Sequence, residues 1–217
     1  SDKWKQLLRF WPHIIVMALT IALCLLPQLV YWKYLSGNWL VYTYQDEHFF
    51  FNDPMILKGL LGFRKGWLIY SPIMLLSIIG MFLVRRYLRD FTLIYLSLLP
   101  CYVYVVFSWW CWWYGGSFGS RPMIDLLPLL VFPLAGLFQL LHERFKRGFI
   151  AITGLVIAFA YLNFFQMRQY QSSLLHWDST TKALYFEIFL NKSWPENYER
   201  LISPPDYEAA KSGKRDI

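Results

Sequence analysis

Five long runs of apolar residues alternate with short polar connections along the first three quarters of the sequence. The runs cover residues 11–32, 67–84, 91–113, 122–141 and 149–165. Each is close to the roughly 20 residues that an α-helix needs to cross a hydrocarbon core about 30 Å thick. Their apolar residues are continuous instead of alternating, which favours helices over barrel strands. The pattern predicts an all-α integral membrane protein with about five transmembrane helices in residues 1–165.

Residues 166–217 are predicted to form a tail outside the membrane. Within the tail, His176 to Leu190 is typical of an amphipathic helix that Asp178 or Ser179 would cap. The apolar positions of this segment are available for the bilayer or for the rest of the protein. We expect the helix to lie on the outer surface.

Basic residues indicate the orientation of the chain. Of the 21 Lys and Arg residues, nine lie in three short connections: Lys3, Lys5, Arg9, Arg85, Arg86, Arg89, Arg144, Lys146 and Arg147. The other connections are longer and carry charges of both signs. By the positive-inside rule, the amino terminus is expected in the cytoplasm and the carboxyl-terminal tail outside.

Composition agrees with a membrane protein. Hydrophobic residues make up 57% of the chain and charged residues 16%, against roughly 45–50% and about 25% in average proteins. This excludes an ordinary soluble domain, and the 20% of aromatic residues excludes a disordered chain. The net charge of +7 is explained by topology and by contact with anionic lipid, so no nucleic-acid partner is expected.

Tryptophans gather at the predicted outer ends of the runs. They are Trp67, Trp109, Trp110, Trp112 and Trp113. An aromatic belt at the membrane interface explains these positions, and stacking on a sugar or lipid in an outer pocket is the alternative.

The predicted outer loop at residues 33–66 carries a dense group of ionisable side chains. Asp46, Glu47 and His48 are consecutive, and Asp53 follows. Adjacent carboxylates suit general-base chemistry because their repulsion raises one pKa. Neighbouring positions point apart, however, and a solvated loop without function explains the group equally well.

The string WWYGGSFGSRPMID, residues 112–125, is the most specific in the chain. Gly115 and Gly116 allow a tight turn, Ser117 adds a hydroxyl, and Arg121 lies beside the start of the fourth run. Backbone N–H groups, a helix amino terminus and an arginine predict an anion site, with a phosphate as its natural ligand. Asp125 lies four residues after Arg121 and is expected either to orient it or to form a purely structural ion pair.

A second basic pair lies at the outer edge of the second run. Arg64 and Lys65 oppose the orientation rule and are expected to attract an anionic headgroup or to form a solvated turn. Possible accessory residues are His48, Trp113, Tyr114, His176 and Asp178. The three cysteines are read as packing residues. No zinc-site spacing, nucleotide-binding loop or hydrolase motif occurs, so no cofactor or metal is expected.

The strings GFRKGWLIYSP, WWYGGSFGSRP and HWDSTTKALY together resemble the later half of C-type (GT-C) polytopic membrane glycosyltransferases, mannosyltransferase-like and of the Bacteroidetes type. The resemblance covers essentially the whole chain. It implies a helical enzyme of the bacterial inner membrane that transfers a sugar from a polyprenyl-phosphate donor to an acceptor on the periplasmic face. In that family the base is an acid of the first outer loop, whereas the loop here is similar to the family's middle loop.

The expected function is therefore the carboxyl-terminal portion of such a glycosyltransferase. Arg121, with Arg64 or Lys65, would bind the donor phosphate, and Asp46 or Glu47 would orient the acceptor or assist the base. The amino-terminal half is expected to be missing from this chain or supplied by a companion protein. The alternative is a non-catalytic membrane subunit that binds lipid or scaffolds a larger complex.

Overall fold

The structure is a computed structural model that describes residues 10–44, 46–83 and 89–215, with backbone alone for residues 89–93. It consists of two compact units, Ser1–Asp46 and Glu47–Ile217. Six of the basic residues used to predict orientation lie outside the described side chains: Lys3, Lys5, Arg9, Arg85, Arg86 and Arg89. The described ones, Arg144, Lys146 and Arg147, are exposed.

The first unit is built on one long apolar helix, α2 (Trp11–Ser36). Pro12 occupies its first turn, where the missing N–H is harmless. The helix ends at Gly37, whose φ of 77° is left-handed and whose N–H donates to the carbonyl of Lys33. With 26 residues and no buried side chain, α2 suits a helix that is surrounded by lipid.

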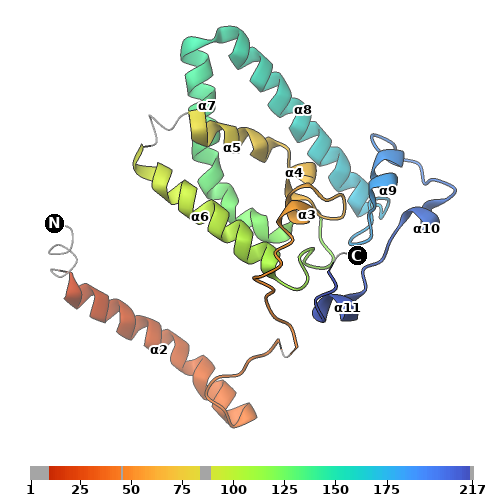
Figure 1. Cartoon of the computed structure of the whole chain (residues 1–217). Helices are drawn as coiled ribbons and strands as arrows, with labels where there is room; N and C mark the ends of the chain where they lie inside the picture. The colour runs from red at the N-terminus through yellow and green to blue at the C-terminus, as the bar shows by residue number, and fades with distance from the viewer. Residues whose placement is uncertain (1–9, 45, 84–88, 216–217) are drawn as a thin grey trace. The chain divides into compact units, whose positions relative to one another are not determined.

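The second unit contains the other helices of the described residues (Figure 1). They are α3 (Ile56–Leu61), α4 (Trp67–Tyr70), α5 (Ile73–Leu83), α6 (Arg89–Ser108), the 3-10 helix η1 (Arg121–Leu126), α7 (Leu127–Arg144), α8 (Lys146–Gln171), α9 (Lys182–Glu187), α10 (Tyr198–Leu201) and α11 (Tyr207–Lys211). No β-strand forms in the described parts of the chain. Backbone pairing outside the helices includes two isolated bridges, Phe49 with Trp109 and Thr180 with Ile202.

Three helices of the described chain are long and apolar enough to cross a membrane: α2, η1 continued by α7, and α8. The predicted run 67–84 is not one helix, because it breaks at Ser71 and Pro72. Proline has no N–H to donate and disfavours helical geometry in the residue before it. The run 91–113 is helical only to Ser108, after which the chain turns to pair with residues 48–50.

The helices α5, α7 and α8 share a small apolar core. Figure 1 shows α7 and α8 meeting at a sharp corner, with α5 crossing α7. At that crossing, Gly80 lies directly against the carbonyl of Pro133, and a Cβ at this position would clash with it. Leu76, Leu137 and Ile152 fill the space between the three helices.

Four of the tryptophans predicted to form an interfacial belt are buried instead. Trp67, Trp110, Trp112 and Trp113 are at most 6% exposed. They surround Phe107, where α6 ends, in the largest apolar cluster of the second unit. Their rings therefore fix the path of the chain between α6 and η1 and do not form a belt.

The tail helix is shorter than the amphipathic pattern predicts. It is confined to α9, and its cap is Thr181, whose Oγ1 accepts a hydrogen bond from the N–H of Leu184 at 3.1 Å. Leu184 and Ile188 are buried against Leu174 on the protein, so these two residues do not face the bilayer. The predicted caps Asp178 and Ser179 hydrogen-bond to each other instead.

The end of the tail is held by a buried arginine. The guanidinium of Arg215 donates to the carbonyls of Ser108 and Trp109, each at 3.3 Å, and to the carboxylate of Asp53 at 3.2 Å. It also lies over the ring of Phe50, 4.6 Å from the centroid. Arg215 therefore ties the tail to the carboxyl-terminal end of α6 and to the loop before α3.

Replacing Arg215 with Ala is expected to destabilise the second unit by about 2 kcal/mol, because the carbonyls of Ser108 and Trp109 each lose a hydrogen bond from the guanidinium. The measurement is thermal unfolding in detergent together with limited proteolysis of the tail after residue 203. Lys214→Ala, one residue away and exposed, is the matched control. Equal protease resistance in the two variants would show that the Arg215 contacts do not hold the tail.

Candidate anion-binding site

A buried lysine lies at the centre of the residues that the sequence singles out. Lys65 is 2% exposed, and its Nζ donates to the backbone carbonyl of Ser117 and lies 3.4 Å from its Oγ. Burial lowers the pKa of Lys65 from 10.5 to about 7; nearby Asp178 raises it, and Arg121 and Arg64 lower it further. Three segments that the sequence singles out therefore meet at the Lys65 side chain: residues 62–72, 112–125 and 176–190.

The glycine-rich loop reaches Lys65 by left-handed turns. Tyr114, Gly115 and Gly119 have φ values of 54°, 65° and 59°. Gly119 also packs closely on Tyr70, since an added Cβ would lie 3.1 Å from the tyrosine Cβ. A residue with a side chain would be strained at either glycine, which explains the glycines of the string. The loop brings the carbonyl of Ser117 to Lys65 as a result.

Asp178 is the acid of the site, and both of its oxygens are engaged. Oδ1 accepts from the Ser179 hydroxyl at 2.7 Å, and Oδ2 accepts from the Tyr207 hydroxyl at 2.7 Å. His176 Nδ1 also lies 3.2 Å from Oδ1. That nitrogen accepts the Ser179 N–H at 3.0 Å, and burial lowers the pKa of His176, so the ring is neutral and this contact is not an ion pair.

Arg64 joins the segment before α4 to the tail. Its Nη1 donates to the backbone carbonyl of Asp178 at 2.6 Å, and its guanidinium lies 5.8 Å from the centre of a Trp113 ring. Burial lowers the pKa of Arg64, while Asp178 raises it. The half-buried guanidinium holds the tail against the tryptophan cluster.

Arg121 and Asp125 do not form the ion pair that their spacing predicts. They lie in η1, a 3-10 helix with about three residues per turn, where positions i and i+4 are on different faces. Asp125 instead accepts a hydrogen bond from the Tyr102 hydroxyl at 3.1 Å. Arg121 is exposed, and within the described chain its guanidinium makes no hydrogen bond or ion pair.

The remaining loop residues divide into exposed and buried ones. Gly116 is exposed and faces Trp177, whereas the hydroxyl of Tyr114 donates to the carbonyl of Val106 at 2.7 Å. Ser120, immediately before Arg121, is 9% exposed, and its Oγ has no hydrogen-bond partner in the described structure. A buried hydroxyl without a partner is unusual and indicates a position that a ligand oxygen could satisfy.

The two acids of the outer loop fall in different units. Asp46 ends the first unit and Glu47 begins the second. Burial raises the pKa of Cys111 to about 11, and Glu47 and Asp178 contribute to that rise, so Glu47 belongs to the surroundings of the site. The ring of His48 lies against Phe50, 4.4 Å between centroids, and the guanidinium of Arg215 lies over the same Phe50 ring.

No protein-family model, curated protein or solved structure matches this chain. The chemistry of the site therefore follows from its own side chains. Arg64 and Arg121 are cations, and Lys65 adds a third positive charge below about pH 7. The Asp178 carboxylate is engaged by hydrogen bonds, so the exposed guanidinium of Arg121 favours an anionic ligand. Among the described residues no group of three or more His, Cys, Asp or Glu side chains could hold a metal ion.

Two residues that support the site were not predicted. Tyr207 orients Asp178, and Arg215 holds the tail that carries Tyr207. Both lie in the polar tail, where nothing in the local sequence distinguishes them. Their partners are 29 and 107 residues away, so only the folded chain reveals them.

The buried lysine makes stability depend on pH. Between pH 7 and 10.5 an unfolded Lys65 still binds a proton that the folded lysine has lost, so stability rises with pH in this window. Each pH unit contributes at most about 1.4 kcal/mol. Wild-type protein is therefore expected to gain melting temperature from pH 7 to pH 9 relative to Lys65→Met.

The comparison is made by thermal unfolding of both proteins at each pH in the same detergent. All other titrating groups contribute equally to the two curves and cancel in their difference. Parallel curves would mean that Lys65 titrates normally.

Proposed function

We propose that this chain is part of a membrane glycosyltransferase that transfers a sugar from a polyprenyl-phosphate donor to an acceptor on the outer face of the bacterial inner membrane. The single observation that carries the proposal is the buried Lys65, bound to the Ser117 loop and accompanied by Arg64 and Arg121. Such a cluster suits a phosphate that becomes more negative as the sugar leaves. The predicted topology and the resemblance of the three strings support the same reaction.

The three cations have different tasks in this mechanism. Arg121 is exposed and makes no hydrogen bond or ion pair in the described structure, so its guanidinium is available for a bidentate contact with the phosphate. Lys65 is buried, and its Nζ holds the Ser117 loop in place by donating to the Ser117 carbonyl. Arg64 is held by the Asp178 carbonyl and fixes the tail beside them. The unsatisfied Ser120 hydroxyl would donate to a phosphate oxygen.

Glu47 is the carboxylate that best fits the acceptor side. Glu47 is half-buried and near Cys111, which itself influences Lys65 and Arg64. In the proposed reaction Glu47 orients the acceptor hydroxyl or assists its deprotonation. The acceptor oxygen bonds to the anomeric carbon with inversion of its configuration as the polyprenyl phosphate leaves.

Arg121→Ala is expected to weaken binding of a labelled polyprenyl-phosphate sugar about tenfold, since a charge-assisted bidentate contact is lost. Arg121→Lys keeps the positive charge but cannot form the bidentate contact of a guanidinium, so this variant should bind the donor with intermediate affinity. Sugar transfer by the full chain is measured alongside binding. Arg200→Ala, which removes another exposed cation of the second unit, is the control. Binding and turnover equal to wild type in Arg121→Ala would overturn the assignment.

A non-catalytic subunit that binds lipid is the second candidate. It is favoured by the engagement of both Asp178 oxygens, which leaves that carboxylate poorly suited to act as a base. Co-purification from the native membrane separates the two functions. A stoichiometric partner protein and no sugar transfer by the chain itself would favour the subunit, whereas transfer that falls in Glu47→Gln with donor binding intact would favour the enzyme.

A further inference from the structure

A pocket lies at the carboxyl-terminal end of α8, apart from the residues of the Lys65 site. Its volume is about 360 Å³. Eight residues line it: Tyr161, Phe164, Phe165, Arg168, Gln169, Ser172, Leu174 and Lys192. None of these lining residues is acidic, and two of them are cations, so the pocket is complementary to a negative charge.

Two neighbouring faces of α8 have different surroundings: one is hydrogen-bonded to the rest of the second unit, and the other is exposed and lines the pocket. Asn163, Gln166 and Gln169 follow one another at three-residue spacing and donate to the Tyr70 carbonyl, the Tyr185 hydroxyl and the Ile188 carbonyl. This amide face binds α4 and the tail. The neighbouring face presents Tyr161 and Phe164, which are 64% and 50% exposed.

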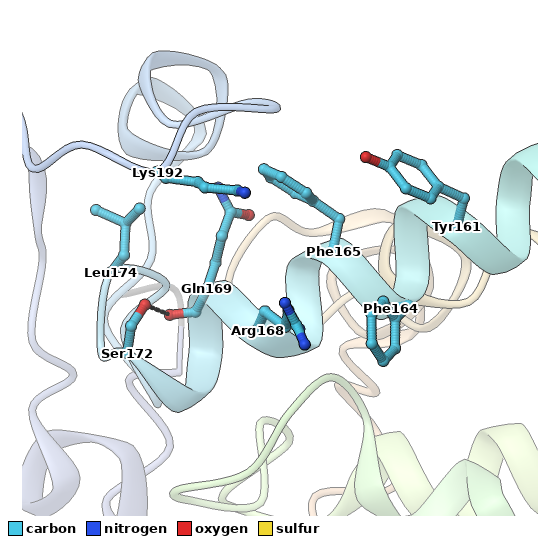
Figure 2. A pocket seen from close by; sticks show the side chains of 8 residues that line it. All are labelled: Tyr161, Phe164, Phe165, Arg168, Gln169, Ser172, Leu174 and Lys192. Carbon is cyan, nitrogen blue, oxygen red and sulfur yellow. Dashed lines mark hydrogen bonds between the residues drawn. The ribbon is translucent and has the colours of Figure 1, made fainter.

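The tail supplies the second cation by a specific connection. Gln169 Nε2 also donates to the carbonyl of Asn191 at 2.7 Å, and the Asn191 side chain accepts the N–H of Lys192 at 2.8 Å. Figure 2 shows Lys192 extending toward the ring of Phe165, and Arg168 lying against the near side of α8. Arg168 is also held over the Phe164 ring, 5.0 Å from its centroid.

The position along α8 places the pocket at headgroup depth. Arg168 lies 22 residues after Lys146, a rise of roughly 33 Å at about 1.5 Å per residue. That rise approximates the hydrocarbon core of about 30 Å. In an α8 that spans the membrane, Arg168 would lie at one surface with Lys192 beside it in the same pocket, and the aromatic residues 161–165 would lie within the adjoining hydrocarbon.

We propose that this pocket binds an anionic phospholipid of the surrounding bilayer, with its phosphate between Arg168 and Lys192 and its acyl chains along Tyr161, Phe164 and Phe165. A soluble anion would gain nothing from the aromatic face. A zwitterionic lipid would bring an additional positive charge beside two cations. The site does not rest on the proposed sugar transfer, because it needs only the membrane and these side chains.

The test compares binding of dioleoyl phosphatidylglycerol and dioleoyl phosphatidylcholine to the full chain in detergent by native mass spectrometry. Wild type is expected to prefer the anionic lipid. Arg168→Gln with Lys192→Gln should weaken its binding about 30-fold, since each basic residue at the surface contributes about fivefold. Arg168→Lys with Lys192→Arg should retain it. The matched control, Arg200→Gln with Lys214→Gln, removes two exposed cations outside the pocket and should leave binding unchanged.

Three results would overturn the proposal. They are equal binding of both lipids by wild type, equal loss in the control pair, and displacement of the lipid by inorganic phosphate, which would indicate a soluble-anion site. A phosphatidylglycerol with a photoreactive acyl chain provides a measurement on wild type alone, in case the glutamine variant fails to fold. Crosslinks are expected within residues 161–172, and crosslinks confined to other segments would contradict the site.

Discussion

Burial of the Lys65 ammonium is the constraint on which the candidate site depends. A buried cation is costly unless polar groups replace the water that it loses. Here the replacement comes from the Ser117 carbonyl and from the field of Asp178. These groups reach Lys65 only when the glycine loop adopts its left-handed turns and the tail lies in place. The site and the fold of the second unit therefore form together.

The tail is attached by neutral groups where it meets the membrane helix. Gln166 and Gln169 donate to oxygens of the tail without carrying a charge, and Asn163 donates in the same way to the Tyr70 carbonyl of α4. Amides near the membrane avoid the large cost of placing ions there, while still satisfying buried polar atoms. Charged attachments also hold the tail, since Arg64 and Arg215 each donate to backbone carbonyls.

The sequence predicted the parts of this structure that depend on local pattern. Hydrophobic runs located α2, α7 and α8, because length and continuity suffice for a spanning helix. The failure at Arg121 and Asp125 has a local cause too, since the pattern assumed α-helical winding and the chain adopts a 3-10 helix. Pairings of distant segments, such as Trp112 with Arg215, depend on tertiary packing and left no local signal.

The proposed phosphate sites at Lys65 and at the end of α8 differ in their response to solution conditions. Lys65 is dehydrated, so its charge is strong in effect but is lost near neutral pH. Arg168 and Lys192 are exposed, so their attraction is weakened mainly by salt, with a screening length of about 8 Å at physiological ionic strength. The affinity for a phosphate is therefore expected to depend mainly on pH at the first site and mainly on salt concentration at the second. Taken together, the two proposals would allow the protein to hold a bilayer lipid constantly while it binds and releases a second phosphate.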